Sequence, residues 1–279
     1  MLILATFYQI LMRIAVFIGK NETDLELRLS NLLEGLAAGG SQCYMVNSEE
    51  GIPENTDMVL SVGGDGTFLS VSKLVADSGI PVVGVNMGRV GFLSENRPED
   101  VAAALLSGDY TIEDRALLSA KVVGSDEQVF ALNEVTVHRS GAAVLGVEVC
   151  LDGKWLPTYW ADGLIVSTSS GSTAYSLSVG GPIVLPYSKV LLISPIAPHN
   201  LNVRPLVVPD TAEIRLRIQS RDGVAVFTAD NVTRELTPDV EIEVSLAQFS
   251  LKRVRLNKSD FINALTEKLF WGEDVRNHK

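Results

Sequence analysis

Short apolar runs alternate with helix-like patterns over the first part of the chain. Leucines at positions 25, 29, 32, 33 and 36 recur at helical spacing, which predicts a helix over residues 24–36 that ends before Gly39 and Gly40. Further helices are predicted over residues 67–76 and 98–106. The apolar runs predict strands at residues 13–18, 43–46, 58–62 and 81–86. Such alternation is typical of an open α/β layer built on a parallel sheet.

The pattern changes beyond Asp114. Apolar and polar residues alternate in short runs separated by Gly, Asp, Asn or Pro, which predicts an all-β architecture of the sandwich or layered-sheet type. The predicted strands cover residues 116–124, 129–138, 144–151, 163–168, 189–194, 205–208, 213–219, 224–228, 240–245 and 251–256. A last helix is predicted over residues 259–270, with Ser259 as its N-cap and Gly272 just past its end.

The predicted fold class is therefore α/β plus all-β. An N-terminal open α/β (Rossmann-like) domain covers residues 1–113, a C-terminal β-sandwich-type domain covers residues 114–256, and residues 257–279 form a tail. With 279 residues, 46% of them hydrophobic, each domain is long enough for a core of its own. Residues 1–11 are apolar, lack basic residues and are too short to span a bilayer. We expect them to be an upstream start-codon extension or a segment that packs on a partner subunit.

A carboxylate stands between glycines directly after the predicted strand 58–62. The segment Gly63-Gly64-Asp65-Gly66-Thr67 lies at the carboxyl end of that strand, where ligands bind in open α/β sheets. Glycines let backbone N–H groups approach a phosphate, and the helix predicted from Thr67 directs its positive end to the same point. The loop therefore favours a phosphate site with Asp65 where charge moves. A tight Asp-Gly turn between two strands is the alternative for this segment alone.

Two further segments carry polar groups at strand ends. Residues 162–178 run from a strand into a turn with six hydroxyl side chains between Ser167 and Thr173, which suits the polar edge of a nucleoside or a phosphate. Asn133 and Glu134 lie inside an otherwise apolar stretch, where buried polar groups need partners. The alternatives are a surface loop whose hydroxyls cap turns, and an ordinary cross-strand hydrogen bond.

These three motifs, in this order and at this spacing, resemble the bacterial NAD kinase family. Residues 84–93, 180–183, 198–199 and 204–207 are similar too, so the resemblance covers nearly everything from Met12 to Gly272. The glycine-aspartate loop is the least specific motif, because it also resembles loops of lipid kinases and phosphofructokinases. The resemblance implies phosphoryl transfer from ATP, or in some members from polyphosphate, to the 2′-hydroxyl of the adenosine ribose of NAD, which gives NADP. It also implies a divalent cation, with Mg²⁺ expected, an NAD-binding second domain, and a tail that packs back on the first.

The resemblance further implies roles for individual residues. Asp65 is expected to accept the proton of the hydroxyl, and Gly66 to contribute a backbone contact beside it. Phe92 is a candidate for stacking on a base, with a core phenylalanine as the alternative. Asn231 stands where relatives commonly carry glutamine, which leaves its contact open. The residues expected to bind the dinucleotide are Asn133, Glu134, Asp162, Ser170, Thr173, Ala174, Tyr175, Ser176, Leu177, Ser178 and Asn231.

Charge and cysteine usage narrow the range of partners. A net charge of −11 argues against nucleic acid and against an anionic membrane surface, so donors for a nucleotide must be concentrated locally in backbone N–H groups and a bound cation. The two cysteines and three histidines have no metal-ligand spacing, so no structural metal site is expected. Free thiols fit a reducing, cytoplasmic location. The family resemblance implies a homodimer or homotetramer.

Several enzyme classes are disfavoured because their signatures are absent. The chain has no P-loop motif, no protein-kinase Asp-Phe-Gly, and no Gly-x-Gly-x-x-Gly after its first strand, which a Rossmann dehydrogenase needs. Two rival functions remain: a lipid or sugar kinase that shares the glycine-aspartate loop, and a non-catalytic NADP-binding module. The choices between ATP and polyphosphate and between NAD and NADH stay open, as does feedback by NADP or NADPH.

Overall fold

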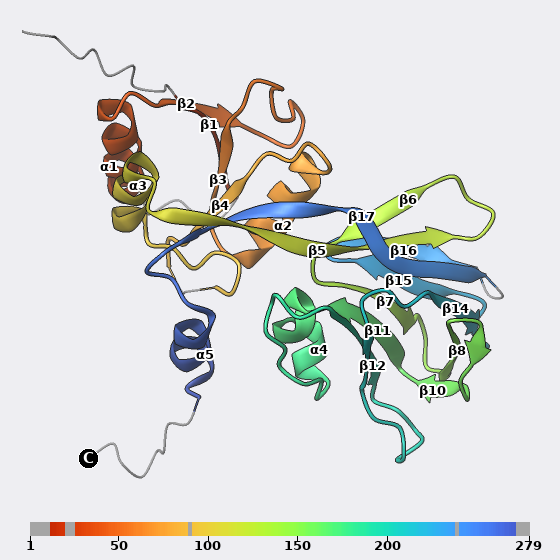
Figure 1. The fold of residues 1–279 in the computed structure, drawn as a ribbon. Helices are drawn as coiled ribbons and strands as arrows, with labels where there is room; N and C mark the ends of the chain where they lie inside the picture. The colour runs from red at the N-terminus through yellow and green to blue at the C-terminus, as the bar shows by residue number, and fades with distance from the viewer. Residues whose placement is uncertain (1–11, 20–25, 89–90, 238–239, 272–279) are drawn as a thin grey trace, which may run out of the picture. The chain divides into compact units, whose positions relative to one another are not determined.

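The computed structural model describes residues 12–19, 26–88, 91–237 and 240–271 (Figure 1). The chain divides into two compact units, one made of Met1–Glu113 with Lys252–Lys279 and the other of Asp114–Leu251. The second boundary falls at Leu251 and not at residue 256, because the end of strand β17 (Glu241–Leu256) pairs with strand β4 (Val82–Val85). Residues 1–11, for which an extension or a partner contact is predicted, lie outside the described residues.

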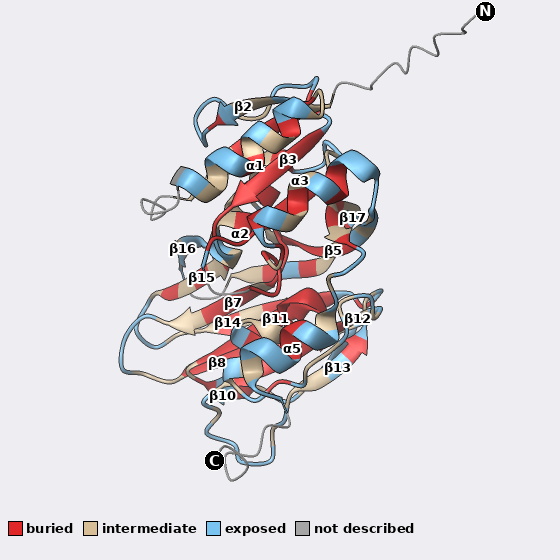
Figure 2. Cartoon of the chain, turned by 90° about the vertical axis from the view of Figure 1, so that its left-hand side faces the viewer, coloured by how far each residue is buried: buried red, intermediate tan, exposed pale blue. Residues whose placement is uncertain are grey.

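The first unit contains a parallel sheet with helices, which confirms the predicted α/β layer. Its strands run in the order β17-β4-β3-β1-β2, and neighbouring strands are parallel. The other bounds are β1 Arg13–Ile18, β2 Gln42–Val46, β3 Met58–Val62, α1 Glu26–Ala38, α2 Asp65–Val75, α3 Pro98–Ser107 and α5 Phe261–Leu269. Strand β3 is buried along its whole length, as a central parallel strand requires, and is red throughout in Figure 2.

The helices of this unit begin where capping groups allow. Helix α2 begins at Asp65 and not at Thr67, because Gly64 in an extended conformation serves as its N-cap. Helix α5 is capped by Asp260, whose side chain accepts the N–H of Ile262. The Ser259 hydroxyl, predicted to cap this helix, donates instead to Asn96 Oδ1 at 2.8 Å. Residues 24 and 25, predicted to open the first helix, lie outside the described residues.

The second unit is built from antiparallel strands, which confirms the all-β prediction. One sheet has the order β13-β12-β11-β7-β15-β16, and a second set of strands pairs as β10-β8-β14-β17, with β9 on β8 and β6 on β5. The bounds are β5 Tyr110–Val122, β6 Gln128–Ala131, β7 Glu134–Arg139, β8 Leu145–Leu151, β9 Lys154–Trp155, β10 Tyr159–Ala161, β11 Gly163–Thr168, η1 Ser170–Thr173, α4 Tyr175–Ser178, β12 Val190–Ile196, β13 Leu206–Pro209, β14 Ile214–Gln219, β15 Ala225–Ala229 and β16 Val232–Leu236.

One hydrophobic core joins the two sets of strands in this unit. Alternate residues of β14 and β15 are buried, so each strand turns one face to the core. Val137 and Leu164 from the six-stranded sheet share a cluster with Val147 and Leu216 from the other set. The sandwich arrangement follows from this shared core.

The described residues include neither a membrane-spanning helix nor a cluster of metal-ligating side chains. None of the helices there combines the length and apolarity that a membrane-spanning helix needs. In the same part of the chain, no three His, Cys, Asp or Glu side chains are grouped so that they could hold a metal ion. Both cysteines are free; Cys150 is buried and Cys43 is half-buried.

Candidate active site

The glycine-aspartate loop joins β3 to α2 and leaves backbone N–H groups open. Gly63 has a φ of 144°, and a Cβ there would lie 2.4 Å from Thr67 Oγ1, so the protein itself requires this glycine. Gly64 and Gly66 are exposed, and a Cβ at either would meet open space. Gly64 also provides no side chain to cap α2. The start of α2 is therefore accessible to an anion that approaches the backbone closely.

The Asp65 carboxylate is held by three consecutive backbone N–H groups. Phe92 N–H donates to Oδ2 at 3.0 Å, Leu93 N–H to Oδ1 at 3.0 Å and Ser94 N–H to Oδ1 at 2.9 Å. Gly91 lies against the same carboxylate, and a Cβ there would lie 1.9 Å from Asp65 Oδ1. The loop after β4 thus fixes the orientation of Asp65, and only glycine fits at position 91.

Lys268 on α5 adds a positive charge to this site. Its Nζ lies 3.3 Å from Asp65 Oδ2, and the Lys268 and Asp65 side chains are 35% and 29% exposed. Burial acts to raise the pKa of the Asp65 carboxyl, but the N–H groups of residues 92–94 and the Lys268 ammonium outweigh burial, and the pKa lies below its usual value. Asp65 is therefore ionised at neutral pH.

Phe92 belongs to the loop after β4, and its side chain packs against helix α5. The side chain is 9% exposed, and its ring packs on Phe261 with centroids 5.8 Å apart. Lys268 Nζ lies 4.3 Å from the centre of the Phe92 ring, a cation–π distance. These contacts fit the core alternative for Phe92, while its stacking on a base stays a prediction.

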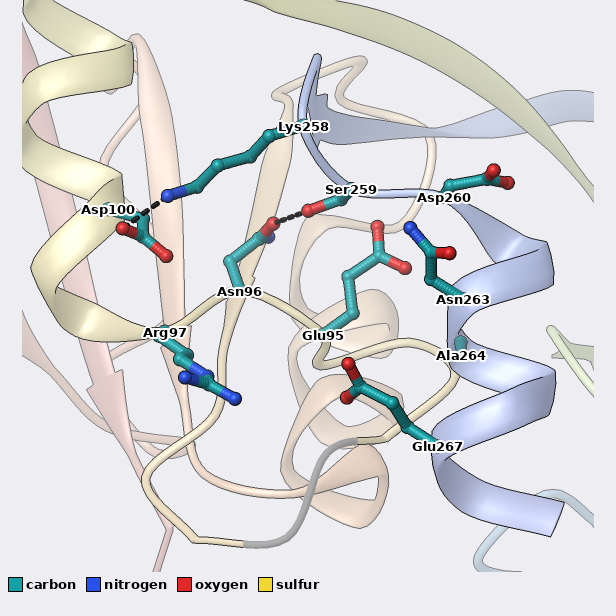
Figure 3. Close-up of a pocket in the computed structure, with 10 residues that line it drawn as sticks. All are labelled: Glu95, Asn96, Arg97, Asp100, Lys258, Ser259, Asp260, Asn263, Ala264 and Glu267. Carbon is teal, nitrogen blue, oxygen red and sulfur yellow. Dashed lines mark hydrogen bonds and ion pairs between the residues drawn. The ribbon is translucent and has the colours of Figure 1, made fainter. Parts of the chain in front are cut away.

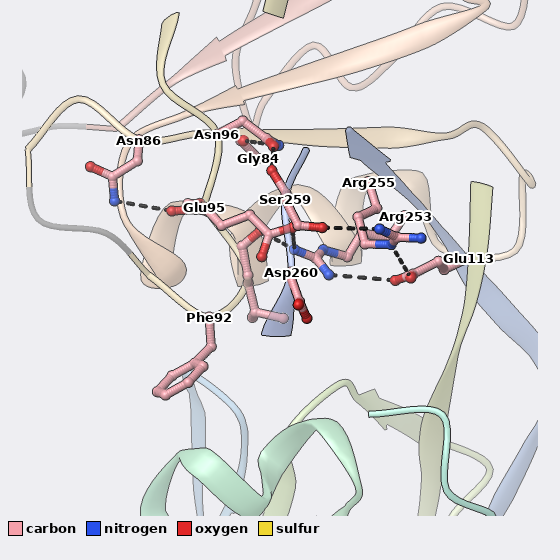
Figure 4. Close-up of polar contacts among 12 residues, drawn as sticks. Gly84, Asn86, Phe92, Glu95, Asn96, Glu113, Arg253, Arg255, Ser259 and Asp260 are labelled. Carbon is pink, nitrogen blue, oxygen red and sulfur yellow. Dashed lines mark hydrogen bonds and ion pairs between the residues drawn. The ribbon is translucent and has the colours of Figure 1, made fainter. Parts of the chain in front are cut away.

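A buried ion cluster fastens the loop that holds Asp65 (Figure 4). Arg253 on β17 is 2% exposed and lies 2.7 Å from Glu95 and 3.5 Å from Glu113. Its Nη2 also donates to the Leu93 carbonyl at 3.4 Å. Arg255 contacts the other oxygen of Glu113 at 2.6 Å. Charges buried this deeply need partners, so the cluster restrains the backbone of residues 93–95.

Two asparagines hold the same loop from the side of β4. Asn86 Nδ2 donates to the Ser94 carbonyl at 3.0 Å, and Asn96 Nδ2 donates to the Gly84 carbonyl at 2.9 Å. Both asparagines are buried. The three N–H groups that bind Asp65 are therefore placed by side chains on both flanks of the loop.

A pocket beside this loop contains none of the predicted site residues (Figure 3). Its lining includes the carboxylates of Glu95, Asp100, Asp260 and Glu267, while Lys258 is paired with Asp100. Arg97 also lines this pocket, and Glu95 is paired with Arg253, so the lining contains charges of both signs.

In the second unit, a carboxylate organises the segment that carries Asn133 and Glu134. Asp230 Oδ2 accepts the N–H of Leu132 at 2.8 Å, and Oδ1 accepts those of Asn133 and Glu134 at 2.9 and 3.2 Å. These bonds take three N–H groups out of strand pairing. The strand predicted over residues 129–138 is consequently interrupted between β6 and β7.

Glu134 is buried beside a second carboxylate. Its side chain accepts the N–H of Tyr175, and its Oε2 is buried with no hydrogen-bond partner among the described residues. Burial, followed by the nearby Asp230 carboxylate, raises the pKa of Glu134 to about 8. Most Glu134 side chains are therefore neutral at pH 7.

The hydroxyl-rich segment forms η1 and α4 and packs on the Asn133 segment. A Cβ on Gly171 would lie 2.1 Å from the Asn133 carbonyl oxygen, so these two backbones are in close contact. Several hydroxyls serve the protein's own backbone and side chains: Ser172 bonds to Val184, Thr173 to Ser170, and Ser176 to Ser194. Tyr175 and Ser178 are exposed, Ala174 and Leu177 are half-buried, and Ser170 and Ser176 are buried.

Asp162 lies at the other end of strand β11 from this contact, whereas Asn231 follows Asp230, whose carboxylate accepts the N–H groups of residues 132–134. Asp162 precedes β11 and forms an ion pair with Arg139 at 2.7 Å. The Tyr175 ring stacks on His138, with centroids 5.7 Å apart, and His138 pairs in register with Gly163, the residue next to Asp162. Asn231 is exposed in the turn after β15. The structure thus brings Tyr175 and Glu134 into contact. Asp162 directly precedes Gly163, which pairs with His138.

Comparison with known proteins identifies the family. Residues 41–108 match the family model "ATP-NAD kinase N-terminal domain" and residues 132–256 match "ATP-NAD kinase C-terminal domain". The chain is 38% identical to an NAD kinase of Flavobacterium psychrophilum, over 97% of each sequence. It is 43% identical to an NAD kinase of Porphyromonas gingivalis, over 89% of this chain and 86% of the relative.

The chain belongs to the NAD kinase family. An NAD kinase from Archaeoglobus fulgidus, solved in complex with ATP, is 29% identical and superposes with a TM-score of 0.76 over 92% of this chain and 98% of that one. A yeast NADH kinase, solved with NADH, has a TM-score of 0.86 at 23% identity over 96% of this chain and 90% of that one, and supports the fold. The predicted family and fold class are thereby confirmed.

Sequence reasoning missed two residues of this candidate site. Lys268 follows no motif, and its contact with Asp65 joins positions 203 residues apart. Asp230, which accepts three N–H bonds from residues 132–134, is the second. A carboxylate in a turn directly after a strand was the available signal for Asp230, whereas the sequence carried none for Lys268.

Proposed function

We propose that this NAD kinase transfers the γ-phosphoryl group of ATP to the 2′-hydroxyl of the adenosine ribose of NAD, with Asp65 as proton acceptor. Phosphorylation of NAD to NADP is the activity of the family to which the chain belongs. The observation that carries the role of Asp65 is its place at the open N-terminus of α2, ionised and fixed by three N–H groups.

The reaction step follows from what the hydroxyl and the phosphate require. The 2′-oxygen of NAD attacks the γ-phosphorus of ATP and forms the new P–O bond. The bond from that phosphorus to the oxygen bridging the β- and γ-phosphates breaks, and ADP leaves with the electron pair. The hydroxyl proton passes to Asp65 and later to solvent. No oxidation or reduction accompanies the transfer.

A carboxylate with a lowered pKa suits this step because the transition state of phosphoryl transfer is loose. The hydroxyl loses its proton late, after the bond to the leaving group has largely broken, so the carboxylate mainly orients the hydroxyl. Asp65 is held in one orientation by the backbone of residues 92–94. Positioning of this kind, together with proton acceptance, contributes about 10²–10⁴-fold to a rate.

The phosphates of ATP are proposed to lie at the glycine loop. Gly64 and Gly66 have no Cβ that would block an anion, and the start of α2 supplies N–H groups and the positive end of its dipole. The family resemblance implies a divalent cation, with Mg²⁺ expected, which would accompany the phosphates of ATP. Such a cation neutralises phosphate charge when ATP is bound.

The dinucleotide is proposed to lie on the second unit. Asn133 lies at the break between β6 and β7 and Glu134 begins β7, and the backbone N–H groups of both residues are bonded to Asp230. A neutral Glu134 can donate a hydrogen bond to a ligand oxygen or nitrogen, which an ionised glutamate cannot. The exposed residues of α4 and the ion-paired Asp162 complete the proposed set. Homodimeric or homotetrameric assembly and a cytoplasmic location stay predictions.

The test is an enzymatic assay with purified full-length protein. NAD, Mg²⁺ and ATP are incubated with the protein, polyphosphate replaces ATP in a parallel series, and NADP is quantified with an NADP-specific dehydrogenase. We expect NADP from the ATP series, while the polyphosphate series defines the donor range. If folded protein forms NADP from neither donor, the proposal is overturned. Diacylglycerol, sphingoid base and fructose 6-phosphate are then tested as acceptors, and NADP binding without turnover would indicate a binding module.

A further inference from the structure

The last turn of α5 carries Lys268 into the Asp65 site. Ala264 and Leu265 are the buried residues of this helix, and Lys268 follows them by four and three positions, so all three lie on one helix face. Phe261, one turn earlier on that face, packs on Phe92. The helix is thus anchored by apolar contacts that direct Lys268 toward Asp65.

Of the four groups that bond to the Asp65 carboxylate, one can be replaced by a substrate. An ionised carboxylate offers about four acceptor positions. Backbone N–H groups of residues 92–94 fill three of them, and these are fixed by the loop. Lys268 fills the fourth at 3.3 Å through a flexible side chain. A substrate hydroxyl that binds Asp65 must therefore take the position of Lys268.

A displaced Lys268 ammonium remains next to the reacting atoms. The hydroxyl that Asp65 orients lies about 3 Å from the carboxylate. The phosphorus that this hydroxyl attacks lies on the side of the hydroxyl away from Asp65, a few ångströms further. Lys268 already reaches the carboxylate and rests over the Phe92 ring. An ammonium has three N–H donors, and an aromatic face takes none of them as an ordinary hydrogen bond. Lys268 can therefore donate to a phosphoryl oxygen after a small side-chain movement.

We propose that Lys268 is a catalytic residue that binds the transferring phosphoryl group when the acceptor hydroxyl takes its place at Asp65. This proposal rests on the proposed function. In the transition state, negative charge spreads over the equatorial oxygens of the phosphoryl group, and a nearby cation stabilises it. Lys268 stays protonated throughout, so the atoms and protons of the transfer step are unchanged.

The experiment compares Lys268→Met and Lys268→Arg with wild type in the NADP assay. Loss of one charge-stabilising donor of this kind typically costs about 10²–10³-fold in kcat. We expect that loss in Lys268→Met, with KM for NAD little changed, and substantial recovery of kcat in Lys268→Arg. Lys258→Met is the matched control, because Lys258 also belongs to the first unit but pairs with Asp100. Its kcat is expected to equal that of wild type.

Three results would overturn the proposal. Wild-type or higher turnover in Lys268→Met would show that the lysine obstructs Asp65 or is dispensable. Equal loss in the Met and Arg variants, together with a lowered melting temperature, would show a purely structural role. Absence of NADP formation by folded wild-type protein would overturn the proposed function and this proposal with it, whereas an active wild type with an active Lys268→Met overturns only the role of Lys268.

Discussion

Each unit contains an aspartate that accepts three consecutive backbone N–H groups, but the ionisable groups beside the two aspartates differ. Asp65 in the first unit and Asp230 in the second each accept three consecutive backbone N–H groups, one on Oδ2 and two on Oδ1. Beside Asp65 lies the Lys268 ammonium, whereas beside Asp230 lies the Glu134 carboxyl. The pKa of Asp65 is lowered, and that of Glu134 is raised to about 8.

The N–H groups of residues 92–94 and the Lys268 ammonium together keep Asp65 ionised, whereas burial, followed by the Asp230 carboxylate, keeps Glu134 neutral. Backbone N–H groups and a nearby cation favour the ionised form of a carboxyl group, which can then orient a hydroxyl. A second carboxyl beside a bonded carboxylate is kept neutral by burial and repulsion, which makes it a hydrogen-bond donor. One unit is therefore suited to proton acceptance and the other to recognition of a neutral ligand group.

The largest expected effect comes from Gly91→Ala, which disrupts the backbone N–H bonds to Asp65. The new Cβ would overlap Asp65 Oδ1, and this short side chain can move only by giving up its N–H bonds. We expect kcat to fall by an amount approaching the about 10²–10⁴-fold contribution of a general base. Gly88→Ala is the matched control, because a Cβ there meets open space. Equal kcat in the two variants would show that the orientation of Asp65 is irrelevant.

Arg253→Met tests whether the loop of Asp65 depends on the buried ion cluster. The change leaves Glu95 without its buried ion-pair partner, and breaking such a pair costs about 3–5 kcal/mol of unfolding free energy. Arg255→Met removes a more exposed arginine from the same cluster and is expected to cost about 0–1 kcal/mol. Urea denaturation measures both. Similar losses for the two arginines would contradict a special role for the buried one.

Glu134→Gln tests the neutral carboxyl through the pH dependence of stability. Between its ordinary value near 4.5 and about 8, Glu134 holds a proton in the folded protein that it loses in the unfolded chain. Folding therefore binds a proton in this window, and this group's contribution to stability falls as pH rises, by at most about 1.4 kcal/mol per pH unit. The glutamine variant should lack this slope when melting temperatures are compared from pH 5 to 9. Parallel curves for the two proteins would contradict the raised pKa.

The smallest expected effect on stability belongs to Asp162→Asn. Asp162 and Arg139 are each about one-third exposed, and exposed ion pairs contribute about 0–1 kcal/mol. We expect a small change in unfolding free energy but a raised KM for NAD, because Asp162 is proposed to contact the dinucleotide. An unchanged KM would remove Asp162 from the proposed site.

The sequence predicted those parts of the fold that local patterns encode. Continuous apolar runs correctly indicated the parallel strands β3 and β4, and alternation indicated the antiparallel strands of the second unit. Helix α3 carries local signals at both ends, since Pro98 begins it and Gly108 in a left-handed conformation ends it. The break between β6 and β7 was not predicted, since Asp230, which causes it, lies 98 residues from Leu132.

The candidate site was predictable to a similar degree. Asp65 could be chosen from its glycine loop and from the family resemblance, and its role stays a proposal. Its hydrogen bonds to residues 92–94 and its contact with Lys268 could not be chosen, because contacts between distant segments leave no periodic pattern in the sequence. Ser176 was chosen from the motif, but its hydroxyl is bonded to Ser194 in the interior, which the sequence did not reveal.

The central claim is that Asp65 accepts the proton in the transfer of phosphate to NAD, and Asp65→Asn tests it most directly. Turnover of NAD with ATP is measured beside NAD binding by isothermal titration calorimetry. Asp57→Asn is the control, because Asp57 also accepts a backbone N–H, that of Arg13 at 2.7 Å, but lies outside the proposed site. We predict a loss of about 10²–10⁴-fold in kcat for Asp65→Asn with NAD binding retained, and wild-type turnover for the control. Wild-type turnover in folded Asp65→Asn would contradict the claim.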